Sequence, residues 1–475
     1  MNYHGSSPTT SEEGRPSGSP SGGVGAGGRG PQPTSSGRPR VLLLGLDSAG
    51  RAQGISAERS LDELGLLVDT WGGVVVGRLI QSRPKPDPSW YVGRGKLDEA
   101  AELARSSEAV LAVTDTELRP IQLRNMERRF DELGLDLRVV DRTQIILEIF
   151  ARRASSREGK LEVDLAQAVY ALPRLSGKGL VLSRLGGGIG TRGPGETKLE
   201  TDRRHLRQRI VDLKREIAEV GRQREVQARA RREAGTPVAA LVGYTNAGKS
   251  TLFNRLTGAD VLVEDKLFAT LDPVVRRLEL PGNQHILTSD TVGFIRSLPH
   301  HLVAAFRATL EEVRGANVLI HVIDSSDPSW PDLTSAATLV LADVGIGGGG
   351  TAPGAVPVIY ALNKTDRLPG GREEALASPE ARQLARDARV VALSADTGEG
   401  VDDLLASLAA VLVARRRVFI LKIPYGQASL VSTLHQQGRV LQERYVEDGI
   451  EIEVELEMAA GRKIEAALGD GRRGE

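Results

Sequence analysis

One short segment constrains the fold of this chain more than any other: residues 243–250 read GYTNAGKS, the GxxxxGK[ST] pattern of a phosphate-binding loop. The apolar run Val238–Val242 precedes it as a predicted strand, and Thr251–Leu256 follows it as a predicted helix. Glycines let backbone N–H groups point at phosphate oxygens, and the helix N-terminus adds favourable partial charge. In this pattern the Lys249 ammonium reaches the terminal phosphates and the Ser250 hydroxyl binds Mg²⁺. The chain must therefore contain the strand–loop–helix unit of an α/β sheet that binds nucleotide phosphates.

The base of the nucleotide is indicated by a segment that ends a later strand. Residues 362–366 read LNKTD and match the NKxD pattern. The Asp366 carboxylate can accept hydrogen bonds from both the N1–H and the exocyclic amine of guanine, whereas adenine would leave it unpaired in a closed site. Ser394, Ala395 and Asp396 follow the next predicted strand and match the loop that lies against the base and contacts it through main-chain groups. These segments predict that the bound nucleotide carries guanine.

Two further segments carry groups for the γ-phosphate and for a metal. Residues 290–293 read DTVG, in which Asp290 serves the Mg²⁺ shell and the Gly293 N–H senses the γ-phosphate. Residues 268–272 read FATLD and supply Thr270, a hydroxyl ligand for Mg²⁺ on a loop that closes only over a triphosphate. In chain order the five motifs are residues 243–250, 268–272, 290–293, 363–366 and 394–396, each expected at the end of a strand, and together they predict a Mg²⁺-dependent switch that hydrolyses GTP.

The motifs assign a role to each position. We expect Lys249, Thr270 and Gly293 to act in catalysis, Ser250 and Thr270 to bind Mg²⁺ directly, and Asp290 to lie in the metal's shell. The residues expected to bind GTP are Gly243, Tyr244, Thr245, Asn246, Ala247, Gly248, Lys249, Ser250, Thr251, Phe268, Ala269, Thr270, Leu271, Asp272, Asp290, Thr291, Val292, Gly293, Asn363, Lys364, Thr365, Asp366, Ser394, Ala395 and Asp396.

Two positions bear on the rate of hydrolysis. Asn246 lies inside the phosphate loop, where some related GTPases use an asparagine to hold a K⁺ ion that acts like an arginine finger; the alternative, that it only stabilises the loop, stays open. Many small GTPases have a glutamine after DxxG that orients the attacking water. Here that residue is Phe294, whose ring makes no conventional hydrogen bond. We therefore expect slow intrinsic hydrolysis and stimulation by an external partner.

The 475 residues are enough for roughly three domains. Residues 1–38 are mostly Gly, Ser and Pro and predict a disordered tail. Alternating strands and helices predict an N-terminal α/β domain over 39–182 and a GTPase domain over 236–415, the latter with a mostly parallel sheet and helices on both faces. Between them, 183–235 combine a Gly-rich loop with a helical arm in which apolar residues recur every seven positions. Residues 416–475 predict a small α+β domain.

The apolar patterns place the individual elements. Strands are expected at Val41–Leu44, Val74–Leu79, Ala109–Val113, Leu137–Val140, Val238–Val242, Val274–Leu280, Ile286–Asp290, Val318–Asp324, Val358–Asn363 and Val390–Ser394. Helices are expected at Ala57–Val68, Lys96–Arg105, Leu118–Leu133 and Glu196–Glu233, with two more between Asp141 and Leu175. The insert Val344–Pro357, with four consecutive glycines, predicts a surface loop.

Composition excludes several classes of protein. The chain has no cysteine, which rules out disulfides, thiolate chemistry, iron–sulfur clusters and Cys-based zinc sites, and its seven histidines include no HExxH. Lys plus Arg equals Asp plus Glu at 62 each, so any basic footprint for nucleic acid must be local. No apolar run approaches the roughly 20 residues of a membrane span, and no secretory signal is visible. We expect a cytoplasmic monomer, with transient membrane association left open.

The order and the residues of these motifs resemble those of the HflX family of translation-factor-class GTPases. The most specific stretch is 186–204, GGGIGTRGPGETKLETDRR. Shorter matches occur at residues 93–96, 141–143, 149–154, 162–166 and 172–175. The resemblance is good from about residue 41 to 413, loose beyond that and absent before it. It implies an N-terminal α/β domain with a helical arm, a GTPase domain, and association with the large ribosomal subunit in the splitting or rescue of stalled ribosomes.

The Gly-rich loop, residues 185–195, suits a contact with ribosomal RNA. Arg184, Arg192 and Lys198 would contact phosphates while the glycines allow close backbone approach. A flexible linker is the alternative, whereas a second nucleotide site is disfavoured because no Lys-Ser/Thr pair follows the glycines. A rival function for the whole chain is an RNA-binding or RNA-remodelling protein with a second nucleotide in the N-terminal domain and a regulatory GTPase.

Overall fold

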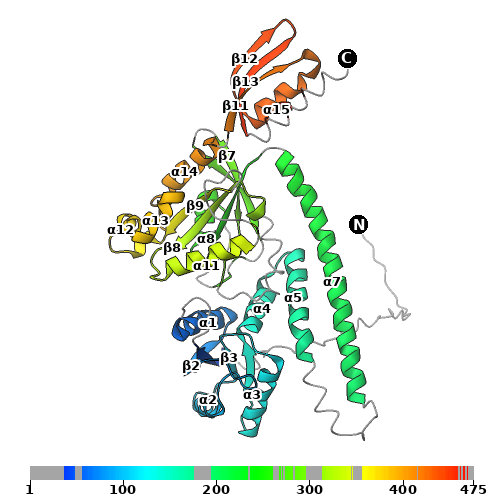
Figure 1. Cartoon of the computed structure of the whole chain (residues 1–475), viewed down its shortest axis with the longest axis vertical. Coiled ribbons are helices and arrows are strands. Elements are labelled where there is room, and N and C mark those ends of the chain that lie inside the picture. Colours follow the sequence, from blue (N-terminus) through cyan, green and yellow to red (C-terminus); the bar gives the residue numbers. More distant parts are fainter. Residues whose placement is uncertain are drawn as a thin grey trace, which may run out of the picture.

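Three β-sheets follow one another along the long axis of the molecule in the computed structural model (Figure 1). The N-terminal sheet lies at one end, a six-stranded sheet in the middle and the C-terminal sheet at the other end, and one long helix runs beside the first two. The structure describes residues 37–48, 56–175, 194–233, 236–259, 267, 268, 270, 273–281, 284–295, 313–343, 345, 356–414, 416–457, 461, 464, 465 and 468.

The N-terminal domain is a four-stranded parallel sheet in the order β2-β1-β3-β4. Its elements are β1 (Arg40–Asp47), α1 (Ala57–Trp71), β2 (Val74–Ser82), α2 (Arg94–Ser106), β3 (Leu111–Thr114), α3 (Pro120–Glu132), β4 (Arg138–Asp141), α4 (Arg142–Arg153) and α5 (Arg157–Arg174). Successive residues of β1 are buried on opposite faces: Leu43 packs with α1 and α4, and Leu42 packs with α2 and α3. A strand that is covered on both faces has a continuous run of apolar residues, and this run allowed β1 to be predicted from the sequence.

The helix α1 shows how the sequence sets these elements locally. The Ser56 hydroxyl accepts from the Arg59 N–H at 3.3 Å and caps the first turn, and the helix ends before Gly72. Leu61, Leu64, Leu67 and Val68 recur at helical spacing and are fully buried. Each such side chain contributes roughly 1.5–3 kcal/mol by burial, so the stripe fixes which face of α1 meets the sheet.

A helical arm follows the N-terminal domain. Helix α7 (Pro194–Glu233) has 40 residues and is therefore about 60 Å long. It packs along α5, with Leu213 fully buried and Arg224 paired with Glu158 at 3.1 Å. The helix begins two residues before the expected Glu196, because proline is well suited to the first helical position.

The middle domain has a six-stranded sheet in the order β10-β9-β8-β5-β7-β6, parallel except for the antiparallel edge strand β6. Its elements are β5 (Val238–Gly243), α8 (Lys249–Thr257), β6 (Val274–Leu280), β7 (Gln284–Asp290), β8 (Val318–Asp324), α11 (Trp330–Asp343), β9 (Val358–Asn363), η4 (Thr365–Arg367), α12 (Gly371–Ala377), α13 (Pro379–Asp387), β10 (Arg389–Ala392) and α14 (Val401–Ala414). The loops after β5, β7, β9 and β10 meet at one edge, where ligands of such sheets bind.

The C-terminal domain is a three-stranded antiparallel sheet in the order β11-β13-β12 with one helix against it. Its elements are β11 (Arg416–Ile423), η5 (Tyr425–Gln427), α15 (Ser429–Gln437), β12 (Arg439–Val446) and β13 (Gly449–Glu457). Ile452 and Val454 on β13 are fully buried, whereas Glu451 and Glu453 point to the other face. This is the half-buried alternation that the sequence predicts.

The structure confirms the predicted fold class, an α/β GTPase domain between an N-terminal α/β domain with a long arm and a small C-terminal α+β domain. Strand ends differ by a few residues; β3, for example, starts at Leu111 rather than Ala109. The predicted tail before residue 37, the Gly-rich loop up to residue 193 and most of the 344–357 insert lie outside the described residues. The domain boundaries at 182 and 235 stay predictions.

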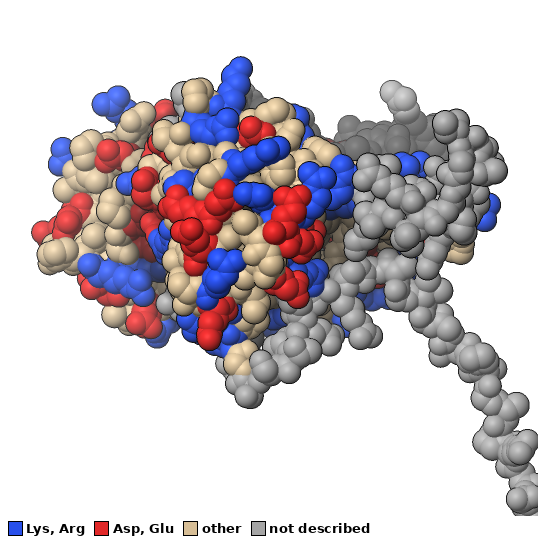
Figure 2. Space-filling view, turned by 90° about the horizontal axis from the view of Figure 1, so that it is seen from below, with Lys and Arg blue, Asp and Glu red and all other residues tan. Residues whose placement is uncertain are grey.

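Two surface properties bear on partners. Among the described residues, no helix is long and apolar enough to cross a membrane. Figure 2 shows the N-terminal end, viewed along the long axis. On the described part of that face acidic and basic side chains are interspersed, and neither forms a large continuous patch. The described residues on this face therefore form no extended basic footprint for nucleic acid.

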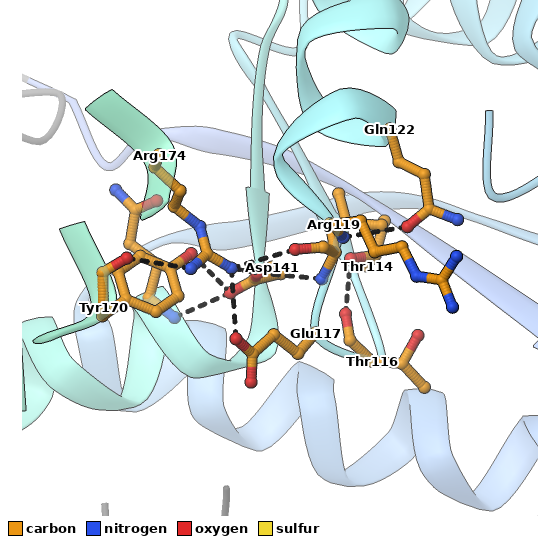
Figure 3. Close-up of polar contacts among 10 residues, drawn as sticks. Thr114, Thr116, Glu117, Arg119, Gln122, Asp141, Tyr170 and Arg174 are labelled. Carbon is orange, nitrogen blue, oxygen red and sulfur yellow. Dashed lines mark hydrogen bonds and ion pairs between the residues drawn. The ribbon is translucent and has the colours of Figure 1, made fainter. Parts of the chain in front are cut away.

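A buried polar cluster joins the end of β4 to the end of α5 (Figure 3). Asp141 is completely buried, and its carboxylate accepts from the Tyr170 hydroxyl at 2.8 Å, the Leu118 N–H at 3.0 Å and the Gln144 N–H at 3.0 Å. Arg174 pairs with the same carboxylate at 3.0 Å. Burial raises the pKa of Asp141, and the Arg174 charge opposes that rise. Because Arg174 is the last residue of α5, the cluster fixes where the chain leaves the domain toward the arm.

We predict that Arg174→Met destabilises the N-terminal domain by about 3–5 kcal/mol, because it leaves the buried Asp141 charge without its partner. Adding Asp141→Asn should recover part of the loss, since no unpaired charge then remains. The measurement is hydrogen exchange of the α4 and α5 amides in the full chain. Arg209→Met, which removes an exposed ion pair with Asp164, is the matched control and should change little. Equal effects of the two arginine substitutions would contradict the prediction.

Candidate nucleotide site

The phosphate-binding loop connects β5 to the first turn of α8. Gly248 is the residue before α8, with a left-handed φ of 92°. A Cβ at this position would lie 2.3 Å from the Asn363 side-chain nitrogen, so both the backbone conformation and the close approach require glycine. Thr245 N–H donates to the Phe294 carbonyl at 2.7 Å, and Phe294 N–H donates to the Gly243 carbonyl at 3.0 Å. The phosphate loop and the DTVG segment are therefore bonded to one another through their backbones.

Lys249 lies under this loop. Its ammonium is buried and donates to the Tyr244 carbonyl at 2.8 Å. Burial lowers the pKa of Lys249 to about 8, while the Asp290 carboxylate acts in the opposite direction. A Cβ on Gly293 would lie 2.8 Å from Nζ, so the DTVG glycine is packed directly against the ammonium. The Lys249 ammonium and the Gly293 backbone are therefore neighbours, and a cation beside a main-chain N–H is a combination suited to a terminal phosphate.

Three side-chain oxygens from separate motifs meet beside Lys249. Ser250 Oγ and Thr270 Oγ1 are 2.8 Å apart, and each donates to Asp290 Oδ2 at 2.8 Å. The other oxygen, Asp290 Oδ1, is buried and has no hydrogen-bond partner among the residues that the structure describes. Burial raises the pKa of the Asp290 carboxyl, and Lys249 is the largest influence opposing that rise. Hydroxyl and carboxylate oxygens with unused lone pairs are ligands of the kind that Mg²⁺ prefers, so these residues fit the metal that the sequence predicts.

The Asn363 side chain connects the base-recognition segment to its neighbours. Its amide donates to the Ala247 carbonyl at 2.8 Å and accepts from the Ala395 N–H at 2.9 Å. Lys364, in a left-handed conformation with φ of 63°, pairs with Asp324 at 2.8 Å. Asp366 follows on the surface of the pocket. The loops after β5, β9 and β10 are thus held in one fixed arrangement.

These loops enclose one cavity of about 300 Å³. Its lining residues are Thr245, Asn246, Gly248, Lys249, Ser250, Thr251, Phe268, Thr270, Thr291, Gly293, Asn363, Lys364, Asp366, Arg367, Ala395 and Asp396. All of them except Arg367 were predicted from the sequence. Among the other predicted residues, Gly243, Tyr244, Ala247, Asp290, Val292, Thr365 and Ser394 lie in the surrounding framework, and Ala269, Leu271 and Asp272 lie outside the described residues.

The predicted RNA contacts cannot be placed. Arg184 and Arg192 lie outside the described residues, and Lys198 lies in α7 at a position where only the backbone is described. Two aromatic residues that follow β2, Trp90 and Tyr91, have different surroundings. Tyr91 is buried at 2% exposure, whereas the Arg94 guanidinium lies over the Trp90 ring, 4.8 Å from its centroid.

Several residues that shape the site were not predicted. Arg255 on α8 donates to the Ala395 and Asp396 carbonyls and so supports the loop behind the base. Asp324 could have been found, because it ends a buried strand as Asp290 does. His321 is buried next to Tyr360, and burial lowers its pKa to about 4, so it is neutral near pH 7. Arg255 carries no signal in its spacing, because its contacts exist only after the loops have been brought together.

Comparisons with known protein families match most of the chain from residue 58 to residue 475. Four family models match in order: "GTP-binding GTPase N-terminal" over residues 58–151, "GTP-binding GTPase Middle Region" over 153–231, "50S ribosome-binding GTPase" over 238–348 and "HflX C-terminal domain" over 381–475. Fold and site together define a P-loop GTPase.

Curated relatives narrow that class. The GTPase HflX of Lacrimispora saccharolytica is 45% identical over 412 residues, which cover 86% of this chain and 92% of that protein. The GTPase HflX of Escherichia coli is 40% identical, with 85% and 91% covered. The chain belongs to the HflX family of GTPases. Among solved structures, a GTP-binding protein from the archaeon Sulfolobus solfataricus in complex with GDP is 23% identical, with a TM-score of 0.42, over 78% of this chain and 98% of that one.

We predict that Asp366→Asn weakens GTP binding by tenfold or more, on the order of one to two charge-assisted hydrogen bonds, and admits xanthosine triphosphate. An amide can donate to the C2 oxygen that replaces the amine of guanine. Titration of both nucleotides measures the change in preference. Asp402→Asn, an exposed carboxylate on α14 outside the cavity, is the control. Unchanged GTP affinity in Asp366→Asn would refute the assignment of the base site.

Proposed function

We propose that this GTPase is a nucleotide-controlled factor of the large ribosomal subunit that acts in splitting or rescuing stalled ribosomes. The match of residues 238–348 to the "50S ribosome-binding GTPase" model is the observation that carries the ribosome assignment. The P-loop site supports a switch that distinguishes GTP from GDP, because groups for the γ-phosphate and for a metal lie on separate loops.

In this proposal the cavity binds guanine nucleotide with the roles that the motifs assign. Lys249 and the amides of residues 243–250 bind the phosphates, and Asp366 binds the guanine edge. Gly293, which lies against the Lys249 ammonium, presents its N–H to the γ-phosphate. The 300 Å³ of the cavity is at the lower end of the range for small-molecule sites.

Mg²⁺ would be held directly by Ser250 and Thr270, with Asp290 in its shell. When bound, it neutralises charge that develops on the phosphate oxygens. Each hydroxyl would contact the metal through an oxygen lone pair and so could keep donating its proton to Asp290. Asp290 would then keep both hydroxyls oriented, because it lies within reach of each.

The residue after DTVG supports the need for an external stimulus. Phe294 is 6% exposed and packs with Val313, Ala337 and Leu341. Its ring therefore serves the core of the domain, and its backbone pairs with the phosphate loop. A side chain in this position cannot orient an attacking water, so the chain itself supplies no group at the position where many GTPases have glutamine.

We predict slow intrinsic GTP turnover and a rise of about 10³-fold or more on addition of large ribosomal subunits, the magnitude that a supplied transition-state group gives in related systems. Steady-state turnover is measured with and without subunits, in K⁺ and in Na⁺. A smaller rise that occurs only in K⁺ would instead assign the stimulus to an ion at Asn246. Fast turnover in Na⁺ that ribosomes leave unchanged would overturn the proposal.

A second prediction concerns the ribosome contact. Deleting Gly187–Pro194 should leave GTP binding intact and abolish ribosome-stimulated turnover, because none of its residues belongs to the nucleotide motifs. Deleting residues 346–353, a Gly-rich segment of equal length in the middle domain, is the matched control. Stimulation that survives the first deletion would make the segment a linker only.

A further inference from the structure

The hydrophobic cluster on one face of the N-terminal sheet includes side chains from the GTPase domain. Leu267 and Phe268 come from the segment before Thr270, and Val292 and Ile295 come from the DTVG segment and the residues after it. All four are at most 6% exposed and belong to the same cluster as residues of α1, α4 and α5. The two loops that respond to the γ-phosphate in a GTPase therefore contribute to the core of the N-terminal domain.

Phe268 makes the most specific of these contacts. Its ring lies edge-to-face on Phe150 of α4, with centroids 4.7 Å apart and an interplanar angle of 82°. The preceding N–H, on Leu267, donates to the Thr70 hydroxyl of α1 at 3.1 Å. Phe268 has a φ of 57°, a left-handed conformation that costs a bulky residue of order 1–3 kcal/mol. Such a conformation persists only where packing compensates for it, and here the compensating contacts come from the N-terminal domain.

Thr270 is two residues beyond this contact. A chain of two residues spans at most about 7 Å, so anchoring Phe268 limits where the Thr270 hydroxyl can lie. In this arrangement the hydroxyl is 2.8 Å from both Ser250 Oγ and Asp290 Oδ2. The docked position of Phe268 is therefore compatible with the position that Thr270 needs as a metal ligand.

The phosphate loop is fastened to the same surface. The Tyr244 hydroxyl donates to Glu63 of α1 at 2.8 Å, and Glu63 pairs with Arg142 of α4 at 2.9 Å. Glu63 and Arg142 are 11% and 5% exposed, so solvent screens this contact only weakly. Helices α1 and α4 thus contact all three elements that surround the γ-phosphate position: the phosphate loop, the segment before Thr270, and the DTVG segment.

We propose that Phe150 is a positioning residue for GTP binding: with Thr70 it holds Leu267 and Phe268 so that Thr270 is placed at the metal site. Helices α1 and α4 are then part of the nucleotide switch. Thermodynamic linkage makes the effect reciprocal, because a domain contact that favours the GTP-bound arrangement must itself be strengthened by GTP. The inference concerns the isolated chain and is independent of the ribosome proposal.

The test compares Phe150→Leu with Phe130→Leu in the full chain. Both phenylalanines are fully buried in the N-terminal domain, but Phe130 lies on the opposite face of the sheet, away from the GTPase loops. Affinities for a non-hydrolysable GTP analogue with Mg²⁺ and for GDP are measured for each variant. We expect Phe150→Leu to lower the preference for the GTP analogue about three- to tenfold, the effect of losing one edge-to-face aromatic pair. GDP affinity should change little in both variants, and Phe130→Leu should retain the parent preference.

Three further measurements distinguish a positioning role of Phe150 from a general contribution to packing. Thr70→Val removes the acceptor for the Leu267 N–H with little change in shape and should lower the same preference by a smaller factor. A double-mutant cycle between Phe150→Leu and Phe268→Leu should be non-additive, because each ring acts through the other. Hydrogen exchange of α4 should slow more with the GTP analogue than with GDP in the parent chain.

The proposal is overturned if Phe150→Leu and Phe130→Leu change both nucleotide affinities alike, since that is the signature of lost stability alone. It is equally overturned if the Phe150–Phe268 cycle is additive, or if α4 exchanges at the same rate with both nucleotides.

Discussion

The nucleotide site depends on the carboxamide of Asn363, which bonds the loops after β5 and β10 to the strand between them. A buried amide is costly unless it is satisfied, and here one side chain uses its donor for Ala247 and its acceptor for Ala395. The Asn363 carboxamide also lies so close to Gly248 that a Cβ at position 248 would collide with it. The loops after β5 and β10 are therefore not independent, and a change in either loop alters the support of the other.

A second constraint acts at the other side of the phosphate loop, where the GTPase and N-terminal domains share a hydrophobic cluster. Leu267, Phe268, Val292 and Ile295 are covered by helices of another domain rather than by their own sheet. Moving the loops on exchange of GTP for GDP would change the burial of these side chains, and burial of each is worth roughly 1.5–3 kcal/mol. That energy is comparable to ordinary coupling between sites, so nucleotide state and domain contact are able to influence one another.

The arm gives such coupling a route to the exterior. Helix α7 packs along α5. Helix α5 ends in the Asp141–Arg174 cluster, which holds it to the end of β4, the last strand of the N-terminal sheet along the chain. The same domain thus touches the GTPase loops through α1 and α4 and supports the arm through α5. In the ribosome proposal, an event at the Gly-rich segment would reach the nucleotide through this one domain rather than along the connecting chain.

The sequence by itself determined the fold class, the approximate positions of the strands along the chain and nearly all of the residues that line the cavity. These depend on local chemistry: apolar runs define buried strands, and motif residues such as Lys249, Asp290 and Asp366 lie at or just beyond strand ends that a parallel sheet brings to one edge. Thr270 is the exception to the expectation that each motif ends a strand, because it precedes the antiparallel strand β6. Only the tertiary structure decided which residues support the motifs. Arg255, Glu63 and Phe150 have no periodicity or spacing that marks them, since their partners lie 140, 181 and more than 100 residues away in the chain. Contacts across such separations depend on how whole domains pack, and no short-range pattern in one sequence encodes that packing.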